Sequence, residues 1–448
     1  MTTVWDPYDP VTCEDPYPVY ARLRADDRWH RTMWGTLAVT RFDDCLEALH
    51  DPRLGNDPRG SDEHRALLEQ PLISATADDF ELAGFMFRDP PEHTCRRGAV
   101  ARGFTPAAVA RWHEPLEEIV EALTDQVVAR GHIDIVNELG PALQTAVMSV
   151  VLGLPHEGMG QLRDWRIASL IAKEAAMARA GDEFEAAAPT GPDAPEQPGD
   201  PDDPLTWWAQ RQAARRGVLA YLGRRIERRR RAPRDDTLTM IARALDDGRG
   251  GLDLMDGALI AEQLVIAGFE TMTYLLGNTI AAALAHPPVW EAMAAGDVEP
   301  DAVVAEALRW DGPVQVVSRF ARQDTAIGGH PIAAGAHVHV LLGAANRDER
   351  RFADADRFDT ARGEDGLAFS HGRHRCLAAH LARLEAARLL GALSRRAPDL
   401  HLVDDRPAHR PDLVLRGHRA LVATWSRRSN SAVVTGSKER KTAGREDP

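Results

Sequence analysis

One of the four cysteines stands in a setting that favours chemistry. Cys376 ends the run FSHGRHRC and directly precedes a predicted amphipathic helix. The free N–H groups at the start of a helix carry partial positive charge, and Arg373, His374 and Arg375 add to that field. Both effects favour the thiolate, which acts as a nucleophile or as a metal ligand. At this point the sequence leaves both roles open for Cys376.

The remaining cysteines and the nearby histidines do not suggest a metal site. Cys13, Cys45 and Cys95 lie far apart, so CxxC and CxxCH motifs are excluded, and with them zinc ribbons and covalently attached c-type haem. Free cysteines usually pack as small hydrophobic side chains. His371 and His374 are three residues apart, but zinc is a weak interpretation because no third or fourth ligand follows at suitable spacing.

The run FSHGRHRCLA, residues 369–378, resembles the haem-binding loop of the cytochrome P450 family, which requires Phe, Gly, a basic residue and Cys at these offsets. Ser370 and Ala378 stand where the family commonly carries Gly, and we expect the extra methyl group to affect redox potential and substrate fit rather than haem binding. The resemblance implies a heme b cofactor with Cys376 as the axial thiolate ligand of its iron. Thiolate ligation makes the iron electron-rich, which favours cleavage of the O–O bond. The implied haem contacts in this loop are Phe369, Gly372, His374, Cys376 and Ala378.

Other marks of the family follow in the family's order over roughly residues 5–426. Glu306 and Arg309 resemble its ExxR pair, and Arg357 resembles the arginine that completes that network. A lone ExxR is a weak signal, since i,i+3 ion pairs are common on solvated helices, but its order and spacing give it weight here. The remaining matches to bacterial members are DPPEHTCRR (89–97), Arg319 and ANRD (345–348).

Haem carries two propionates that need basic partners when they are buried. His93 and Arg97 are four residues apart and therefore share one face of a predicted helix. Arg319 and His374 complete the set of candidate partners. Each of the four could instead be an ordinary surface base, and the resemblance favours the propionate role.

The run AGFET (267–271) resembles the oxygen-binding kink of the family's central helix, which implies that Ala267 and Gly268 contact the haem. Splitting O₂ requires two protons at a buried site, and an acid followed by a hydroxyl, Glu270 and Thr271, can relay them through ordered water. Alternatively, Glu270 caps a kink and Thr271 bonds back to a carbonyl one turn earlier. We favour the relay, because family members that rearrange peroxides or couple radicals often lack one of these two residues.

By resemblance, mainly apolar side chains form the substrate pocket, which favours a hydrophobic ligand. The candidates are Phe85, Val265, Phe269, Val314, Val316, Val414 and Leu415.

The composition of the 448-residue chain is that of an ordinary globular protein. Hydrophobic residues make up 44% and charged residues 27%, which excludes global disorder, collagen and a disulfide scaffold. A formal net charge of −14 argues against a nucleic-acid partner. The start, MTTVWDPYDP, lacks the basic and apolar regions of a signal peptide, so we expect a cytoplasmic location.

Helical signals outnumber strand signals and no βαβ alternation appears, so the sequence predicts a mainly α fold with a minor β-rich region. The apolar segment 258–285 contains Glu262 and Glu270, and a carboxylate in mid-membrane is costly, so we predict a buried central helix. The resemblance implies one domain, residues 1–426, with haem between this helix and the helix after Cys376. The other predicted elements are helices at 18–25, 41–49, 205–231, 302–309 and 377–394 and strands at 36–40 and 337–341.

Two segments differ in composition from the rest. Residues 180–204 carry a proline at every third position from 189 and eight acids without Lys or Arg, a period that fits polyproline II. We predict a solvated, partly disordered insertion, with a lid or a partner-docking strap as the alternative. The helix that follows ends in IERRRR, which is more often a solvated face than a nucleic-acid patch. Residues 427–448 are predicted to be a disordered tail.

These features predict a haem-thiolate monooxygenase that hydroxylates or epoxidises a small organic, natural-product-like substrate. No GxGxxG motif follows a strand, so electrons from NAD(P)H must come through a ferredoxin and its reductase. Arg373, Arg375, Arg383 and Arg388 are expected to form a basic docking spot for the ferredoxin. We expect a monomer with no nucleic-acid or membrane partner. The alternatives are a P450 that couples phenols or closes rings without oxygen insertion, and a non-catalytic haem-thiolate binding protein.

Deletion of residues 186–203 should leave haem incorporation intact, because a solvated insertion contributes little to a packed core. The ratio of haem to protein absorbance and the spectrum of the reduced CO complex measure this. Loss of haem in the deletion variant would show that the insertion is structural.

Overall fold

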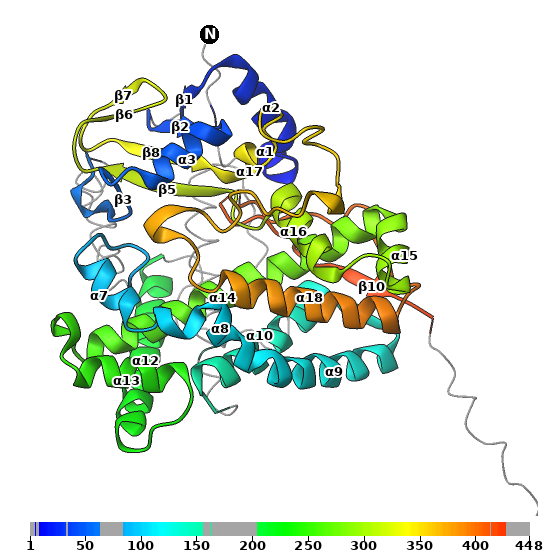
Figure 1. The fold of residues 1–448 in the computed structure, drawn as a ribbon, viewed down its shortest axis with the longest axis horizontal. Helices are drawn as coiled ribbons and strands as arrows, with labels where there is room; N and C mark the ends of the chain where they lie inside the picture. The colour runs from blue at the N-terminus through cyan, green and yellow to red at the C-terminus, as the bar shows by residue number, and fades with distance from the viewer. Residues whose placement is uncertain are drawn as a thin grey trace, which may run out of the picture.

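Helices dominate the part of the chain that the computed structural model describes, namely residues 9–32, 35–62, 84–155, 204–412 and 414–426 with Trp5 and Leu162. Most of the strands gather on one side of the molecule and the long helices on the other (Figure 1). The prediction of a mainly α fold with a minor β-rich region is therefore confirmed. The tail, residues 427–448, and all of the acidic segment before Pro204 lie outside the described residues.

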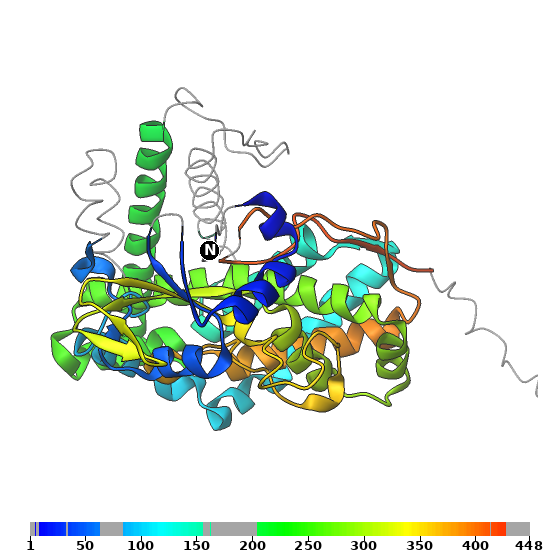
Figure 2. The same cartoon turned by 90° about the horizontal axis from the view of Figure 1, so that it is seen from above.

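Seven helices, together with α13 (Thr237–Asp246), build most of the large hydrophobic core. Seen from above, α12 projects from one side of the molecule (Figure 2). In chain order these seven helices are α9 (His113–Arg130), α10 (Gly140–Leu152), α12 (Pro204–Arg231), α14 (Leu254–Ala285), α15 (Pro287–Ala295), α16 (Pro300–Asp311) and α18 (Ala379–Arg396).

The central helix α14 packs against α10, α12, α16 and α18, and most of its side chains are buried. It begins four residues before the predicted start. Asp253 accepts the N–H of Asp256, and the Asp256 carboxylate accepts the N–H of Asp253, so this reciprocal cap satisfies donors that the apolar pattern does not reveal. The other predicted helices are found within about two residues of their expected bounds, as is usual for helix ends.

The β region is built around a sheet with the strand order β1-β2-β8-β5-β3. The central pairs are parallel between β2 and β8 and antiparallel between β8 and β5. β5 carries Arg319 into the interior, and the sheet packs on its own hydrophobic cluster. The strands are β1 (Trp29–Arg31), β2 (Leu37–Val39), β3 (Leu54–Gly55), β5 (Val316–Ala321) and β8 (His337–Leu341).

The remaining elements are short. β6 (Thr325–Ile327) and β7 (His330–Ile332) form a hairpin, and β10 (Val422–Thr424) joins β4 (His132–Asp134) and β9 (His401–Leu402). The other α-helices are α1 (Pro10–Glu14), α2 (Tyr17–Asp26), α3 (Phe42–His50), α7 (Glu92–Gly98), α8 (Pro106–Val109), α13 (Thr237–Asp246) and α17 (Leu342–Ala345).

A buried ion pair joins α16 to the loop that leads to Cys376. The Arg309 guanidinium donates two hydrogen bonds of 2.7 and 2.8 Å to Glu306, and both side chains are fully buried. Its other N–H groups donate to the carbonyls of Asn346, Ala355 and Arg357, so every charged atom of the pair has a partner. This network fixes the backbone of residues 346–359 against α16.

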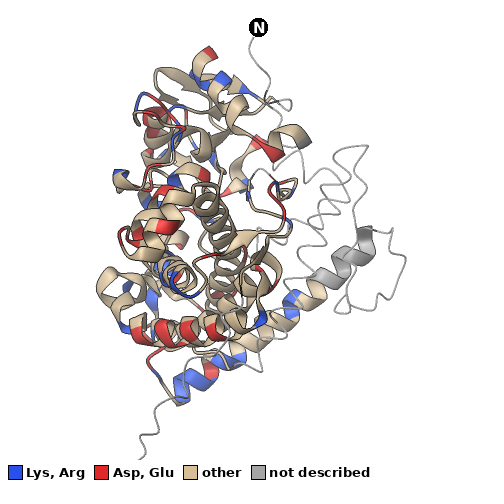
Figure 3. Cartoon of the chain, turned by 90° about the vertical axis from the view of Figure 1, so that its right-hand side faces the viewer, with Lys and Arg blue, Asp and Glu red and all other residues tan. Residues whose placement is uncertain are grey.

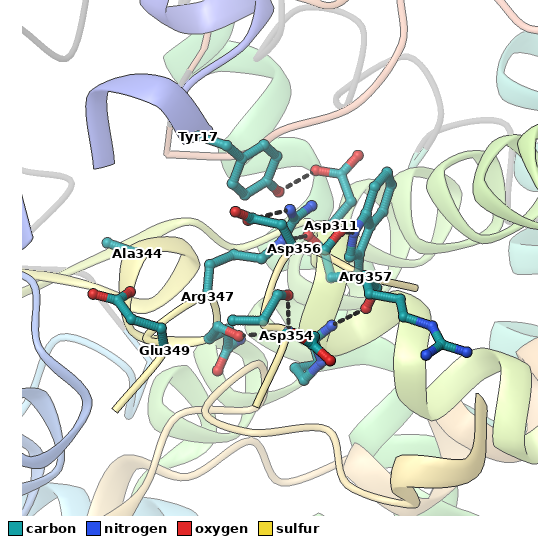
Figure 4. A network of polar contacts seen from close by, with 12 residues as sticks. Tyr17, Asp311, Ala344, Arg347, Glu349, Asp354, Asp356 and Arg357 are labelled. Atoms are coloured by element: carbon teal, nitrogen blue, oxygen red, sulfur yellow. Dashed lines mark hydrogen bonds and ion pairs between the residues drawn. The ribbon is translucent and has the colours of Figure 1, made fainter. Parts of the chain in front are cut away.

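The prediction that the Arg357 side chain completes this network is wrong. Arg357 contributes its carbonyl oxygen, while its guanidinium is exposed and extends away from the cluster (Figure 4). The cation beside Glu306 is that of Arg362, with Nε 3.5 Å from Oε1. The N–H of Asp359 donates to the same Glu306 oxygen, and the short turn that follows brings Arg362 back to it. The run RFDTAR (357–362) contains both arginines, and only the turn between them decides which side chain reaches Glu306.

A second buried acid lies on α18. Glu385 has only Gln144 of α10 as a hydrogen-bond partner among the described residues, at 2.9 Å. Burial raises the pKa of Glu385 to about 8, and the Gln144 hydrogen bond opposes this only in part. The folded protein therefore holds a proton that the unfolded chain releases above its ordinary carboxyl pKa of 4.5.

Because the folded-state pKa of Glu385 is raised, its contribution to stability is complete at low pH and is lost as pH rises toward about 8. Replacing Glu385 with Gln removes this titration. We expect the free energy of unfolding of the variant, relative to the parent, to increase by about 1 to 4 kcal/mol between about pH 5 and pH 8, measured by urea unfolding. Glu114→Gln, at an exposed position of α9, is the control. Parallel curves for parent and Glu385→Gln would contradict the assignment.

Candidate active site

The loop before α18 holds Cys376 in a fixed turn. The Cys376 N–H donates to the carbonyl of Phe369 at 2.9 Å, and the Arg375 N–H donates to Gly372 at 3.1 Å. Gly372 has φ of 70°, and a Cβ there would lie 2.5 Å from the carbonyl oxygen of Leu49. A glycine is therefore required at this position by both the backbone conformation and the close approach of α3.

Ser370 stands at a position where the family motif commonly carries Gly, and the backbone conformation there explains that preference. Its φ is 57°, in the left-handed region that glycine occupies without strain. Its Oγ is buried and has no hydrogen-bond partner in the described part of the chain. The loop thus keeps the turn that the family motif encodes with Gly, at some conformational cost.

The expectation that the loop favours a thiolate at Cys376 needs correction. Burial raises the pKa of the Cys376 thiol above its usual value, and the Ala378 N–H with the charges of Arg97 and Arg375 opposes this without reversing it. The side chain is nonetheless exposed. The polypeptide alone therefore does not produce the thiolate.

Four basic side chains from three separate segments meet beside this loop. His93 and Arg97 come from α7, Arg319 from β5 and His374 from the short turn Gly372–His374. The rings of His93 and His374 lie 4.3 Å apart, and Arg97 Nη2 donates to the carbonyl of Arg375 at 2.8 Å. The structure thus brings together all four residues predicted to face the propionates, and we refer to them as the basic cradle.

The basic cradle contains buried donors without acceptors. His93 Nε2, Arg319 Nη2 and His374 Nε2 have no hydrogen-bond partner in the described chain. Burial lowers the pKa of His93 to about 4 and that of Arg319 to about 10, and nearby positive charges act in the same direction. Buried donors that lack acceptors are costly, and two carboxylates placed here would satisfy them.

Asp89 provides the one carboxylate next to the basic cradle among the described residues. It begins the matched run DPPEHTCRR, but the sequence analysis assigned it no role of its own. Its Oδ1 lies 3.9 Å from His374 Nε2 and accepts the N–H of Asn56. Burial would raise the pKa of Asp89, but His374 and the N–H groups of Asn56 and Asp57 lower it below its usual value. A Cβ on Gly55 would lie 2.1 Å from Oδ2, so glycine is needed for this close approach.

The middle of α14 carries one accessible stripe. Ala267 is exposed and Glu270 and Thr271 are half-buried, although the helix around them is buried. The Thr271 hydroxyl donates to the Ala267 carbonyl one turn earlier, which is the local hydrogen bond of the alternative interpretation. The helix continues unbroken through 267–271, so the expected kink is not a break in the helix.

Gly268 has a packing role that the sequence did not reveal. A Cβ there would lie 2.2 Å from Cε of Met148, so glycine at 268 permits the close packing of α14 on α10. The predicted haem contact of Gly268 stays a prediction.

The predicted pocket residues divide into three groups. Phe85 packs against the basic cradle, with its ring 6.4 Å from His93 and Arg97 over its face at 6.0 Å. Val314 forms a β-bridge with Leu415, and Val414 is exposed beside them. These four residues remain pocket candidates.

Three other pocket predictions are not supported by the structure. Val265 and Phe269 are buried in the main core, because they lie on the face of α14 opposite the accessible stripe. Val316 packs with Trp5 and Tyr20 in a small N-terminal cluster. Ile266, next to Ala267, is 38% exposed. It lies on the accessible side of α14, where the sequence analysis expected Val265 and Phe269. The apolar run of α14 has no period that could separate these faces.

Two of the four arginines expected to form the ferredoxin-docking spot are neutralised locally. Arg383 pairs with Asp301 and Asp365, and Arg388 pairs with Glu117. Arg373 and Arg375 are half-buried and form no ion pair within the described residues. The positive charge near the Cys376 loop is therefore smaller than the sequence predicts.

Comparison with known proteins connects this geometry to a family. Residues 300–396 match the family model described as Cytochrome P450. The chain is 33% identical over 436 residues to cytochrome P450 monooxygenase PikC of Streptomyces venezuelae, covering 94% of each chain. It is 32% identical to 6-deoxyerythronolide B hydroxylase of Saccharopolyspora erythraea, covering 93% of this chain and 98% of the relative. The chain belongs to the cytochrome P450 family.

The fold agrees with this assignment. The crystal structure of Mycobacterium smegmatis CYP164A2 superimposes with a TM-score of 0.76 at 30% identity, covering 93% of this chain and 98% of the other. Since these relatives are P450 monooxygenases and hydroxylases over nearly the full length, this P450 is an oxidoreductase of the monooxygenase type. Its family cofactor is haem iron, and the basic cradle with its unsatisfied donors fits the two haem propionates.

Two segments of this P450 are long and apolar enough to cross a membrane, Ile135–Gly153 and Leu254–Ala285. Their most apolar windows are 56% and 72% buried inside the protein. Core helices of soluble proteins pass the same test of length and composition.

Replacing Cys376 with Ala should abolish the red-shifted Soret band of the reduced CO complex, because that band depends on a thiolate ligand to the iron. Cys95→Ala is the matched control, since Cys95 lies on α7 between His93 and Arg97 but is assigned no ligand role. An unchanged CO spectrum in Cys376→Ala would overturn the ligand assignment.

Proposed function

We propose that this P450 uses electrons from NAD(P)H, delivered by a ferredoxin and its reductase, to hydroxylate or epoxidise a small hydrophobic substrate of natural-product type. The observation that carries the proposal is the set of buried donors in the basic cradle that lack acceptors among the described residues and lie beside the Cys376 loop. We infer that the accessible stripe of α14 faces the same site. When bound there, heme b supplies the activation of O₂ and the transfer of one oxygen atom to the substrate.

The residues of this chain supply the iron ligand, the partners of the propionates and further contacts to the cofactor. Cys376 provides the sulfur ligand, and His93, Arg97, Arg319 and His374 hold the propionates through charge-assisted hydrogen bonds. Binding these donors to carboxylates offsets the cost of burying them. Contacts from Phe369, Gly372, Ala378 and Ala267 complete the proposed cofactor site.

Glu270 and Thr271 are proposed to move protons toward the oxygen site. Both lie on the accessible stripe of α14, and the half-buried Glu270 carboxylate makes no hydrogen bond to the described residues, so it is free to contact water. The Thr271 hydroxyl donates its proton to the carbonyl oxygen of Ala267. Its oxygen keeps two lone pairs that can accept a hydrogen bond from water. An acid and a hydroxyl on adjacent positions can thus pass protons through ordered water.

The substrate class follows from the pocket candidates and the relatives. Phe85, Ile266, Val314, Val414 and Leu415 present mainly apolar surface. The names of two relatives refer to a macrolide precursor, 6-deoxyerythronolide B, and to polyketide biosynthesis, in PksS of Bacillus subtilis. We infer a hydrophobic natural product as the substrate of a monomeric, cytoplasmic enzyme.

Isotope-labelled O₂ tests the reaction type directly. A ligand from a natural-product panel is first selected by its shift of the haem spin state, and it is then turned over with ferredoxin, reductase and NAD(P)H. One labelled oxygen atom in the product supports monooxygenation. Unlabelled coupled or cyclised product would favour the oxidative coupling alternative, and binding without any turnover would favour a non-catalytic haem-thiolate protein.

Thr271→Ala should lower the product formed per NAD(P)H and release hydrogen peroxide, because proton delivery by positioned groups contributes about 10² or more to rate. We expect at least about a threefold loss of coupling in assays of product, peroxide and NAD(P)H. Thr273→Ala is the control, since the Thr273 hydroxyl also bonds back one turn, to Phe269, but on the buried face. Equal coupling in the two variants would reject the relay.

A further inference from the structure

A basic groove lies between α12 and the first turns of α14, away from the basic cradle and the Cys376 loop. Its volume is about 1080 Å³. Arginines of α12 form one side and apolar side chains of α14 form its floor. We call it the α12 groove, and its defining residues are Arg216, Arg224, Arg228, Arg231, Leu254 and Met255.

The four arginines of the α12 groove lack counter-charges. Each is exposed, and none forms an ion pair or hydrogen bond within the part of the chain that the structure describes. Three other arginines of the same helix are paired, Arg215 with Glu262, Arg229 with Asp236 and Arg230 with Asp246. Arg225 has no ion pair among the described residues and lies over the ring of Tyr221. Basic residues continue along the exposed side of α12 (Figure 3). The unpaired charge is therefore concentrated on the groove side of the helix.

The spacing of these arginines follows one face of a helix. Residues 216, 220, 223, 224, 227, 228 and 231 recur at intervals of three and four, which places them in one stripe along α12. From Arg216 to Arg231 the stripe is about 22 Å long at 1.5 Å per residue. Glu227 is the one acid lining the groove, and its carboxylate is engaged by Arg230 at 2.8 Å.

The centre of the groove is small and apolar. Ala220 and Gly223 lie in the middle of the stripe, and a Cβ added to Gly223 would find nothing closer than 3.8 Å. Beneath them, Leu254 and Met255 are 38% and 48% exposed, which is unusual for large apolar residues at the start of a core helix. Small residues between the long arginine side chains allow the backbone of a partner to approach closely. The groove is therefore concave as well as positively charged.

We propose that the α12 groove is the docking site of an acidic protein partner that inserts an amphipathic helix of about four turns. Such a helix matches the length of the stripe, its central apolar residues cover Leu254 and Met255, and its flanking carboxylates pair with the four arginines. A flat anionic membrane would leave the concave floor uncovered, and a single small anion would neutralise only part of the stripe. This docking goes beyond the proposed oxidation and does not depend on it.

The test uses the full-length holoenzyme and a labelled 16-residue helical peptide with leucines at its centre and glutamates toward both ends. Fluorescence anisotropy should show saturable binding that weakens as salt is added, because exposed charges are screened. Arg224→Glu combined with Arg228→Glu should weaken binding at least about tenfold, since both changes replace attraction by repulsion. Gly223→Leu should weaken it as well without any change in charge. Arg22→Glu, at an exposed position of α2, should bind like the parent.

Three outcomes would overturn the proposal. They are no saturable binding at low salt, equal binding by the parent and the double variant, and binding that appears only after residues 182–203 are deleted. The last result would identify this chain's own acidic segment as the occupant. Binding of phosphatidylglycerol vesicles without binding of the peptide would identify a lipid surface instead. An unchanged CO spectrum in every variant ensures that the loss of docking is not a loss of fold.

Discussion

The structure depends on a group of buried hydrogen-bond donors that the polypeptide does not satisfy. His93, Arg319 and His374 arrive from a helix, a strand and a turn far apart in the sequence, and each leaves a buried nitrogen without an acceptor. Asp89 balances part of this charge but is itself occupied by backbone N–H groups. Buried donors without acceptors are costly, so the basic cradle favours an anionic group beside it. Burial also disfavours the charged form of Cys376 and raises the pKa of its thiol.

The central helix connects this site to the rest of the molecule. Two turns before Glu270, the buried Glu262 carboxylate holds Arg215 of α12 through two hydrogen bonds of 2.8 and 2.9 Å. The next residue, Gln263, accepts the N–H of Met86, beside the pocket candidate Phe85. Adjacent side chains of α14 therefore position two segments next to the active site.

Charge is distributed unevenly over an acidic protein. The expected basic spot near Cys376 is partly neutralised, because Arg383 and Arg388 have acidic partners on neighbouring elements. Four exposed arginines without ion pairs among the described residues line the α12 groove. The net charge of the protein thus describes neither the region near Cys376 nor the α12 groove. Whether an arginine can attract an acidic partner depends on whether a neighbouring acid already pairs with it.

The sequence alone determined the fold class and the family, because those depend on residue types at fixed spacing. FSHGRHRCLA and ExxR are local signals, whereas the four bases of the cradle come from distant segments that only the fold brings together. Only the tertiary structure decided which neighbours face which way. It exchanged Arg357 for Arg362 beside Glu306, because a turn reverses the chain between them. It placed Ile266 rather than Val265 and Phe269 on the accessible stripe of α14, because a helix that is apolar on every side carries no period to mark its faces. It also showed which arginines lack partners, since pairing depends on residues that are distant in sequence and close only after folding.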